Sequence, residues 1–139
     1  MKKIILASHG DLAKGMMSTI KMLSGIDENI YSFSFHEGQN VLTIQDDVRK
    51  IINESDESDE FIIITDIPGG SVNTALMPLL EYKNVHLISG MNTLLVLTLV
   101  LDSDINASSI LNCIEEGRNS MVYINENINT NNESGDFFD

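Results

Sequence analysis

A histidine and an aspartate, each placed directly after a short apolar run, are the side chains of this sequence best suited to chemistry. His9 follows Ile4-Ile5-Leu6-Ala7-Ser8, and Asp66 follows Phe61-Ile62-Ile63-Ile64-Thr65. An aspartate that accepts the proton of one imidazole nitrogen fixes the tautomer, which leaves the lone pair of the other nitrogen free as a nucleophile. If the fold brings His9 and Asp66 together, the pair suits nucleophilic work by the histidine.

The segment Gly69-Gly70-Ser71 could hold an anion beside this pair. We expect a helix to begin here, so that backbone N–H groups and the Ser71 hydroxyl face the anion with the positive end of the helix dipole behind them. Each part is weak alone, because Gly-Gly is common in turns and Asp66 could be a helix cap. Their combination with His9 predicts a phosphoryl site.

Other kinds of site fit the sequence less well. It lacks the G-x-G-x-x-G and G-x-x-x-x-G-K-[ST] patterns of nucleotide-binding loops, and its three histidines show no zinc-ligand spacing, so we predict no metal site. A histidine phosphatase would carry an arginine before the histidine, where this chain has Ser8. Cys113, the only cysteine, has apolar neighbours at helical spacing and is expected to be a small buried side chain.

Three further residues are candidates for contact with a partner protein. His36 follows a predicted strand and should lie on the same rim as His9, whereas His86 lies inside a strand and is expected to pack there. Met16 and Met17 lie on the helix that begins beside His9. Their simplest role is core packing, but the helix would also present them to a docking protein.

The elements that must position these residues alternate along the chain. Apolar runs and spacings predict strands at 4–7, 30–35, 61–64 and 85–88, helices at 11–23, 41–52, 72–82, 93–101 and 105–117, and a fifth strand at 121–124. Such alternation is typical of an α/β fold, an open three-layer sandwich with a mainly parallel sheet. In the strand order 2-1-3-4, His9 and Asp66 would face each other at the point where the strand order reverses.

Composition limits the class of protein and its partners. The 139 residues suit one globular domain, with 42% hydrophobic and 21% charged residues. A formal net charge of −13 disfavours nucleic acid and anionic membrane surfaces as partners. The longest apolar run, 94–101, is too short to span a membrane, and the apolar stretch near the start is too short for a signal peptide, so we expect a cytoplasmic protein.

Two segments differ in composition from the rest. Residues 54–60 contain five acids and are expected to form a solvated loop. Residues 125–139 are rich in Asn, Glu and Asp and contain few large apolar side chains. We therefore expect a folded domain over 1–124 and a disordered acidic tail over 125–139.

Three separated motifs resemble the IIA component of the mannose-type sugar phosphotransferase system. They are Ala7-Ser8-His9-Gly10, the T-D-x-x-G-G-S motif within residues 65–73, and Ile88-Ser89-Gly90-Met91-Asn92. Two departures lie next to the predicted phosphoryl site: Pro68 stands where the family commonly has an aromatic residue, and Ser71-Val72-Asn73 replaces a Ser-Pro-x-Asn version. The likeness covers about residues 1–124.

The resemblance implies a phosphotransferase that works through a phosphohistidine. His9 would accept a phosphoryl group from phospho-HPr and pass it to a IIB component, with Asp66 orienting the ring and no metal, nucleotide or other cofactor consumed. It also implies a homodimer that exchanges an antiparallel last strand, which would fall at 121–124 here. Membrane association would be indirect, through the sugar permease.

Two alternatives stay open at this point. A similar domain feeds a dihydroxyacetone kinase, where the phosphoryl group goes to a nucleotide bound on another protein. A regulatory module of the same fold could instead use phosphorylated His9 only as a signal.

Overall fold

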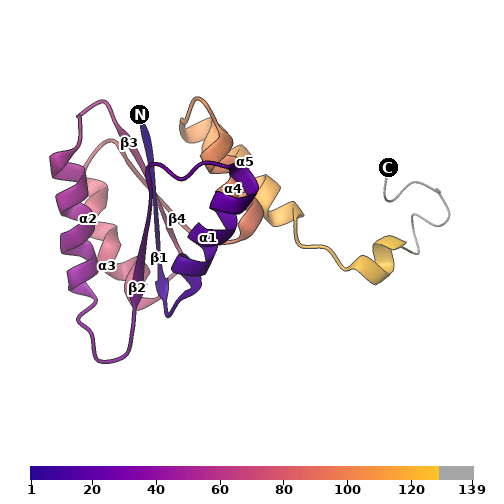
Figure 1. Cartoon of the computed structure of the whole chain (residues 1–139), viewed down its shortest axis with the longest axis horizontal. Helices are drawn as coiled ribbons and strands as arrows, with labels where there is room; N and C mark the ends of the chain where they lie inside the picture. The colour runs from indigo at the N-terminus through magenta and orange to yellow at the C-terminus, as the bar shows by residue number, and fades with distance from the viewer. Residues whose placement is uncertain (129–139) are drawn as a thin grey trace.

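The computed structural model describes residues 1–128 and contains a four-stranded parallel sheet of order β2-β1-β3-β4 (Figure 1). The elements are β1 (Lys2–His9), α1 (Leu12–Ser24), β2 (Ile30–Phe35), α2 (Leu42–Glu54), β3 (Glu60–Thr65), α3 (Ser71–Leu76), the 3-10 helix η1 (Met77–Glu81), β4 (Val85–Ser89), α4 (Thr93–Leu101) and α5 (Ala107–Asn119). The predicted α/β class and the strand order 2-1-3-4 are confirmed.

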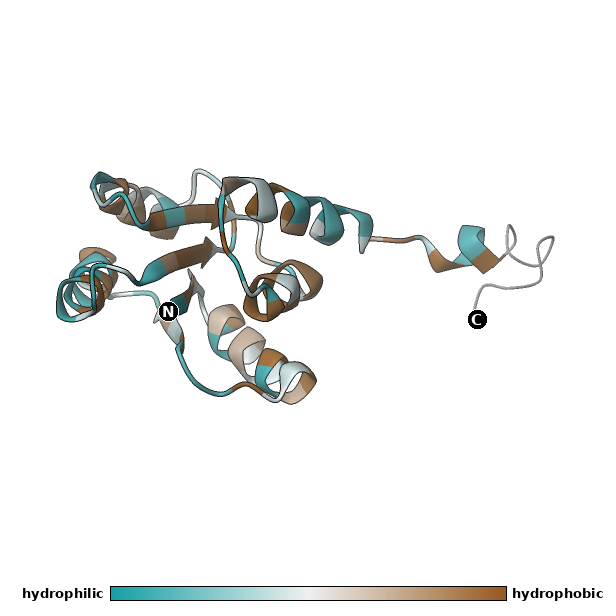
Figure 2. Ribbon diagram, turned by 90° about the horizontal axis from the view of Figure 1, so that it is seen from above, coloured by the Kyte–Doolittle hydropathy of each residue, from teal (hydrophilic) through white to brown (hydrophobic). Residues whose placement is uncertain are grey.

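Helices cover both faces of the sheet, which gives three layers (Figure 2). α1, α4 and α5 pack on one face, and α2, α3 and η1 pack on the other. Alternate residues of β1 enter the two cores: Ile4 and Leu6 lie under α1 and α4, and Ile5 and Ala7 under α2 and α3. Burial on both sides explains why this strand reads as a continuous apolar run. Cys113 is buried in the first of these cores, as predicted.

The strand register brings the ends of β1, β3 and β4 to one edge of the sheet. Ala7 pairs with Thr65, and Thr65 pairs with Ser89 on the next strand. His9 at the end of β1 pairs with Phe35 at the end of β2. The loops that follow these strands therefore meet at the carboxyl edge, where ligands bind in parallel sheets.

The helix predicted over 72–82 is divided in the structure. α3 ends at Leu76, and the chain tightens into η1, which contains Pro78. Proline has no N–H to donate, and its ring clashes with the preceding turn, so an α-helix cannot continue through it unchanged. Leu76 and Leu79 remain fully buried on the two sides of this change.

The last helix runs two residues further than predicted and begins two residues later. Asn106 caps α5: its side chain accepts the N–H of Ser109, whose hydroxyl in turn accepts the N–H of Asn106. Gly117, expected at the helix end, lies inside α5. A Cβ there would come within 2.9 Å of Leu95 Cβ, so the glycine allows α5 to approach α4 closely.

The acidic segment 54–60 is only partly the solvated loop that we expected. Asp59 is buried and pairs with the Met1 α-amino group at 3.2 Å and with Lys3 Nζ at 3.5 Å. Burial would raise the pKa of Asp59, but these cationic partners outweigh it and lower the pKa. Glu60 belongs to β3 and contacts His86. Two of the five acids thus join the end of the sheet opposite His9.

The chain after α5 leaves the body of the domain (Figure 1). Residues 121–123 lie outside helices and strands, and 124–128 form a short helix, so this single chain does not form the fifth strand predicted at 121–124. Exchange of that strand with a second copy stays a prediction. Of the tail predicted to be disordered, 125–128 fall in the short helix and 129–139 lie outside the described residues.

Candidate functional site

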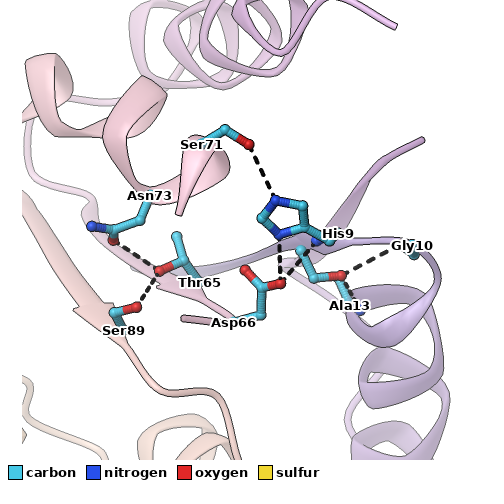
Figure 3. Close-up of polar contacts among 9 residues, drawn as sticks. His9, Gly10, Ala13, Thr65, Asp66, Ser71, Asn73 and Ser89 are labelled. Atoms are coloured by element: carbon cyan, nitrogen blue, oxygen red, sulfur yellow. Dashed lines mark hydrogen bonds and ion pairs between the residues drawn. The ribbon is translucent and has the colours of Figure 1, made fainter. Parts of the chain in front are cut away.

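His9 and Asp66 meet at the carboxyl edge of the sheet, where β1 and β3 end side by side (Figure 3). The Nδ1 atom of His9 lies 2.8 Å from Asp66 Oδ2. The backbone N–H of His9 donates to the same oxygen at 3.0 Å. Asp66 therefore holds both the main chain and the ring of His9, which fixes the direction in which the imidazole points.

The carboxylate and the imidazole differ in exposure. The side chain of Asp66 is 11% exposed and that of His9 is 42% exposed. Burial would raise the pKa of Asp66, but the hydrogen bonds from the ring and backbone of His9 outweigh it and hold the pKa below its ordinary value. A charged carboxylate accepts the Nδ1–H, so the tautomer with a free Nε2 lone pair is favoured.

The second ring nitrogen points towards the start of α3. His9 Nε2 lies 3.1 Å from Ser71 Oγ, so the hydroxyl can donate to the Nε2 lone pair (Figure 3). Ser71 is the first residue of α3, and Gly70 precedes it in an extended conformation. The predicted phosphoryl-binding segment therefore lies directly against the predicted nucleophile.

The two glycines of this segment serve different needs. Gly69 has a φ of +78°, which residues with a Cβ rarely adopt. Gly70 lies against the imidazole: a Cβ there would be 3.2 Å from His9 Cε1 and 3.0 Å from Ile67 Cγ1. Gly70 thus makes room for the ring of His9. The sequence alone indicated only anion binding or a turn for this glycine.

Two residues that sequence reasoning did not select also support the site. Phe35 contacts the His9 ring edge to face, with ring centroids 5.8 Å apart. Ser8 is fully buried, and its Oγ accepts the Ala13 N–H at 2.7 Å, which caps the first turn of α1. The signal for Phe35 was present in the sequence, because the strand order 2-1-3-4 places the end of β2 beside His9.

The predicted partner-contact residues divide into two groups. Met16 is 8% exposed and packs in the core with Ile20, four residues later, so little of its side chain is available to a docking protein. Met17 is half-buried at the edge of the same core. His36 is exposed on the rim, and its Nε2 lies 3.3 Å from Asp11 Oδ1, two residues after His9.

The arrangement provides a nucleophile, a group that orients it and a hydroxyl beside the reacting nitrogen. Over residues 1–128, no three His, Cys, Asp or Glu side chains gather as a metal site would require. Within the same range, none of the helices has both the length and the apolar character needed to cross a bilayer. An imidazole that is oriented by a carboxylate, with a hydroxyl beside its second nitrogen, is chemically able to act as a nucleophile.

Comparison with known proteins gives three informative relatives. The chain is 29% identical over 101 residues to the sorbose-specific EIIA component of the phosphotransferase system (PTS) of Klebsiella pneumoniae, a match that covers 72% of this chain and 73% of that protein. It is 28% identical over 103 residues to the mannose-specific EIIAB component of Escherichia coli K12, covering 73% of this chain but 32% of that longer protein.

A solved structure with a related name is also similar to this chain. The PTS IIA protein associated with the fucose utilization operon of Streptococcus pneumoniae superposes with a TM-score of 0.78 at 26% identity, over 91% of this chain and 96% of that one. The family model described as the PTS system fructose IIA component matches residues 3–116, and this range contains His9, Asp66 and the segment 69–71. This chain therefore belongs to the mannose-type family of IIA components of the sugar phosphotransferase system.

Proposed function

We propose that this chain is a cytoplasmic phosphocarrier that accepts a phosphoryl group from phospho-HPr on His9 and passes it to a IIB component. The observation that carries the proposal is the orientation of His9. Asp66 Oδ2 lies 2.8 Å from Nδ1, and Nε2 points towards Ser71 at the exposed edge of the sheet. The nucleophilic atom is thus the nitrogen that a second protein can reach.

The transfer balances without a further reactant, because a phosphohistidine donor is already activated. The Nε2 lone pair of His9 forms a bond to phosphorus as the bond from phosphorus to the donor imidazole breaks, and that electron pair returns to the donor nitrogen. The His9 ring gains positive charge, which the Asp66 carboxylate stabilises. The onward step reverses these changes with the IIB nucleophile as acceptor.

Ser71 and the two glycines before it are the proposed phosphoryl-binding residues. In the unphosphorylated chain the Ser71 hydroxyl lies 3.1 Å from Nε2, so it must turn away from this nitrogen when the phosphorus bond forms. The hydroxyl can then donate to a phosphoryl oxygen. We propose that the backbone N–H groups of Gly69 and Gly70 assist it, because these residues lead into the start of α3 and Gly70 lies against the His9 ring.

The surface around His9 suits docking by another protein. Leu12, the first residue of α1, and Ile67, in the loop that follows β3, are large apolar side chains exposed near the site. His36 and Asp11 form a polar pair on the same rim. We propose that HPr and IIB contact this face in turn, and that association with the membrane occurs only indirectly, through the sugar permease.

A homodimer is the proposed assembly. The edge of β4 that does not pair with β3 borders a groove lined by apolar residues of β4 and α5, among them Leu87, Ile110 and Ile114. Met121, Val122 and Tyr123 are exposed on the segment that leaves α5. We propose that this segment of a second copy adds to β4, which would cover both apolar surfaces.

The test is phosphorylation in a reconstituted system. The chain is incubated with enzyme I, HPr and phosphoenolpyruvate, and mass spectrometry locates the acid-labile phosphate, which is expected on His9. The phosphorylated chain is then mixed with its IIB component, and transfer is followed by loss of the label. Absence of a label on His9 contradicts the proposal.

The same experiment separates the two alternatives. Transfer to nucleotide bound on a dihydroxyacetone kinase, with none to IIB, would identify the related kinase-feeding role. A stable phosphohistidine that neither acceptor removes would identify a regulatory module. A His86→Asn variant is the matched control, because it removes another histidine that contacts a carboxylate, at 2.9 Å, away from the proposed site.

A further inference from the structure

A second group of polar side chains lies next to the His9 site, and hydrogen bonds to Thr65 link its members (Figure 3). Thr65 Oγ1 lies 2.8 Å from Asn73 Oδ1 and 2.8 Å from Ser89 Oγ. The three residues come from the end of β3, the first turn of α3 and the end of β4. Thr65 is fully buried, so water does not compete for its hydroxyl.

The hydrogen bonds of this group have one consistent direction. The Thr65 hydroxyl carries a single proton, and Asn73 Oδ1 can only accept, so Thr65 donates to Asn73. The Ser89 hydroxyl then donates to Thr65 Oγ1. The group is a chain from Ser89 through Thr65 to Asn73, and removal of the central hydroxyl interrupts both of its bonds.

The main chain of Thr65 is held at the same place. The N–H groups of Gly90 and Met91 donate to the Thr65 carbonyl oxygen at 3.1 and 3.0 Å. The loop after β4 is therefore fastened to the residue that directly precedes Asp66. The position from which Asp66 reaches His9 depends on these contacts.

Asn73 connects the group to the other side of the site. It lies two residues after Ser71 in the first turn of α3. The bond from Thr65 to Asn73 thus ties the start of α3, which carries Ser71, to the end of β3, which carries Asp66. Asp66 and Ser71 contact opposite nitrogens of the same imidazole, so this one bond relates the two contacts to each other.

We propose that Thr65, Asn73 and Ser89 form a positioning network for phosphoryl transfer, one that holds Ser71 and Asp66 at matched distances from the two nitrogens of His9. The inference rests on the proposed function of His9. Among the hydrogen bonds of residues 1–128, those of the His9 ring go to Asp66 and Ser71 and not to these three residues, so the three act through Asp66 and Ser71 and are positioning residues.

The helix itself does not depend on this bond. Val72 and Leu76 of α3 are fully buried in the core, and Gln45 Nε2 donates to the Ala75 carbonyl at 2.6 Å. These contacts keep α3 against α2 and the sheet when the Asn73 bond is lost. The freedom gained is at the start of the helix, where Ser71 lies.

The test compares hydroxyl and amide deletions inside and outside the network. Thr65→Val and Asn73→Ala remove its bonds, and Thr65→Ser restores the hydroxyl. Thr98→Val is the control for the first, because the Thr98 hydroxyl bonds only to Leu94 and Leu95 carbonyls of its own helix among the described residues. Asn84→Ala is the control for the second, because Asn84 bonds the Asp59 carbonyl at the other end of the sheet.

The expected result is a change in the transfer step and not in donor binding. The maximal rate of phosphoryl acceptance from phospho-HPr should fall about 10- to 100-fold in Thr65→Val and Asn73→Ala, because small displacements of a reacting group cost rates of this order. The KM for phospho-HPr should stay close to that of the unaltered chain. Thr65→Ser should recover most of the rate, and both controls should transfer normally.

A second readout does not require transfer. In the unphosphorylated chain, the 15N chemical shifts of the His9 ring report the tautomer and the bonds to Asp66 and Ser71. These shifts should change in Thr65→Val and Asn73→Ala and stay constant in Thr98→Val and Asn84→Ala. A merely structural role for Thr65 would lower the melting temperature without moving the His9 resonances.

The outcomes separate the two proposals. If the unaltered chain accepts no phosphoryl group, the proposed function is wrong, and the ring shifts alone decide whether the network positions His9. If the unaltered chain is active and Thr65→Val and Asn73→Ala transfer at its rate, the network proposal is overturned. It is also overturned if Thr65→Ser is as slow as Thr65→Val, or if Thr98→Val slows transfer equally.

Discussion

Two histidines of this chain lie beside a carboxylate at almost the same distance, at opposite ends of β3. His9 Nδ1 is 2.8 Å from Asp66 Oδ2, just after the strand ends, and His86 Nε2 is 2.9 Å from Glu60 Oε2, at the residue where the strand begins. A search for histidine–acid pairs by distance would rank them together. Their surroundings nevertheless differ.

The difference lies in what else each pair touches. Asp66 Oδ2 also accepts the His9 backbone N–H, the carboxylate is largely buried, and Ser71 lies at the other ring nitrogen. Glu60 is 42% exposed, and its partner His86 is a side chain within a strand. We propose that the held acid and the Ser71 hydroxyl make the His9 pair suited to phosphoryl transfer, whereas the exposed pair of His86 and Glu60 is a surface contact of small energetic value.

Replacing the two histidines is the strongest test of this contrast. His9→Ala should abolish phosphorylation while the domain stays folded, since the residue lies at a strand end and is partly exposed. His86→Ala should be phosphorylated at the normal rate. Mass spectrometry of both variants after incubation with enzyme I and HPr decides the matter, and an acid-labile phosphate on His36 or His86 would refute the assignment.

Replacing the two acids should give the next largest effect. The backbone N–H and Nδ1 of His9 both contact Asp66 Oδ2, so the amide of Asp66→Asn has two options at that position. It can place its oxygen there and lose the negative charge, or place its NH₂ there, which favours the wrong tautomer and faces the backbone N–H with another donor. Transfer should slow by about 100-fold or more, while the free energy of unfolding changes by about 1 kcal/mol.

Glu60→Gln is the matched control for this change and should transfer normally. Quenched time courses with phospho-HPr give the rates of phosphoryl transfer, and urea unfolding gives the free energies of unfolding. A loss of rate in Asp66→Asn that merely follows its loss of stability would show that Asp66 is structural.

The glycine beneath the ring of His9 sharpens the comparison further. Gly70→Ala places a methyl group 3.2 Å from His9 Cε1 and should displace the ring, slowing transfer by about tenfold. Gly15→Ala, in the first turns of α1, meets no other part of the described chain within 4 Å of the added Cβ, so it should transfer normally and stabilise the fold by about 0.5–1 kcal/mol. Equal rates in the two variants would mean that the close approach of Gly70 has no role in the site.

The smallest expected effect is a pH dependence of stability. The pKa of Asp66 is lower in the folded chain than in the unfolded chain, so its carboxylate stabilises the fold above the unfolded value of about 3.9. That contribution is lost as the pH falls through the folded pKa. The difference in unfolding free energy between the unaltered chain and Asp66→Asn, measured by urea unfolding at several pH values, should therefore shrink in this acid range. A difference that stays constant with pH would contradict this prediction.

The sequence was sufficient for the features that depend on periodicity and strand order. Apolar runs predict the four strands, and the order 2-1-3-4 predicts that His9 lies opposite Asp66, as the structure has it. The Ser71 hydroxyl also lies where the segment 69–71 indicated. These predictions succeed because parallel strands bring the residues after them to one edge whatever the details of packing.

The features that the sequence did not reveal depend on contacts between distant elements. In the sequence Asp59 is one of five neighbouring acids, and its ion pair with Lys3 becomes evident only from the fold. Gly117 reads as a helix end, and only the closeness of Leu95 shows that it is a packing contact. For Met16 the sequence favours core packing and adds contact with a docking protein as a second role, and the structure places its side chain in the core.

The separation of His9 from Asp66 in the sequence has a consequence for how the site comes into being. The two residues are 57 positions apart, and Ser71 is 62 positions from His9. The contact between them closes with the pairing of β1 and β3, which is a long loop for a folding chain to close and is favourable only once the strands and their covering helices are in place. During synthesis, His9 emerges early and stays unpaired until β3 has been made. The bond between His9 and Asp66 is therefore a reporter of the pairing of β1 with β3, and fragments that end before β3 should hold the histidine without its orientation.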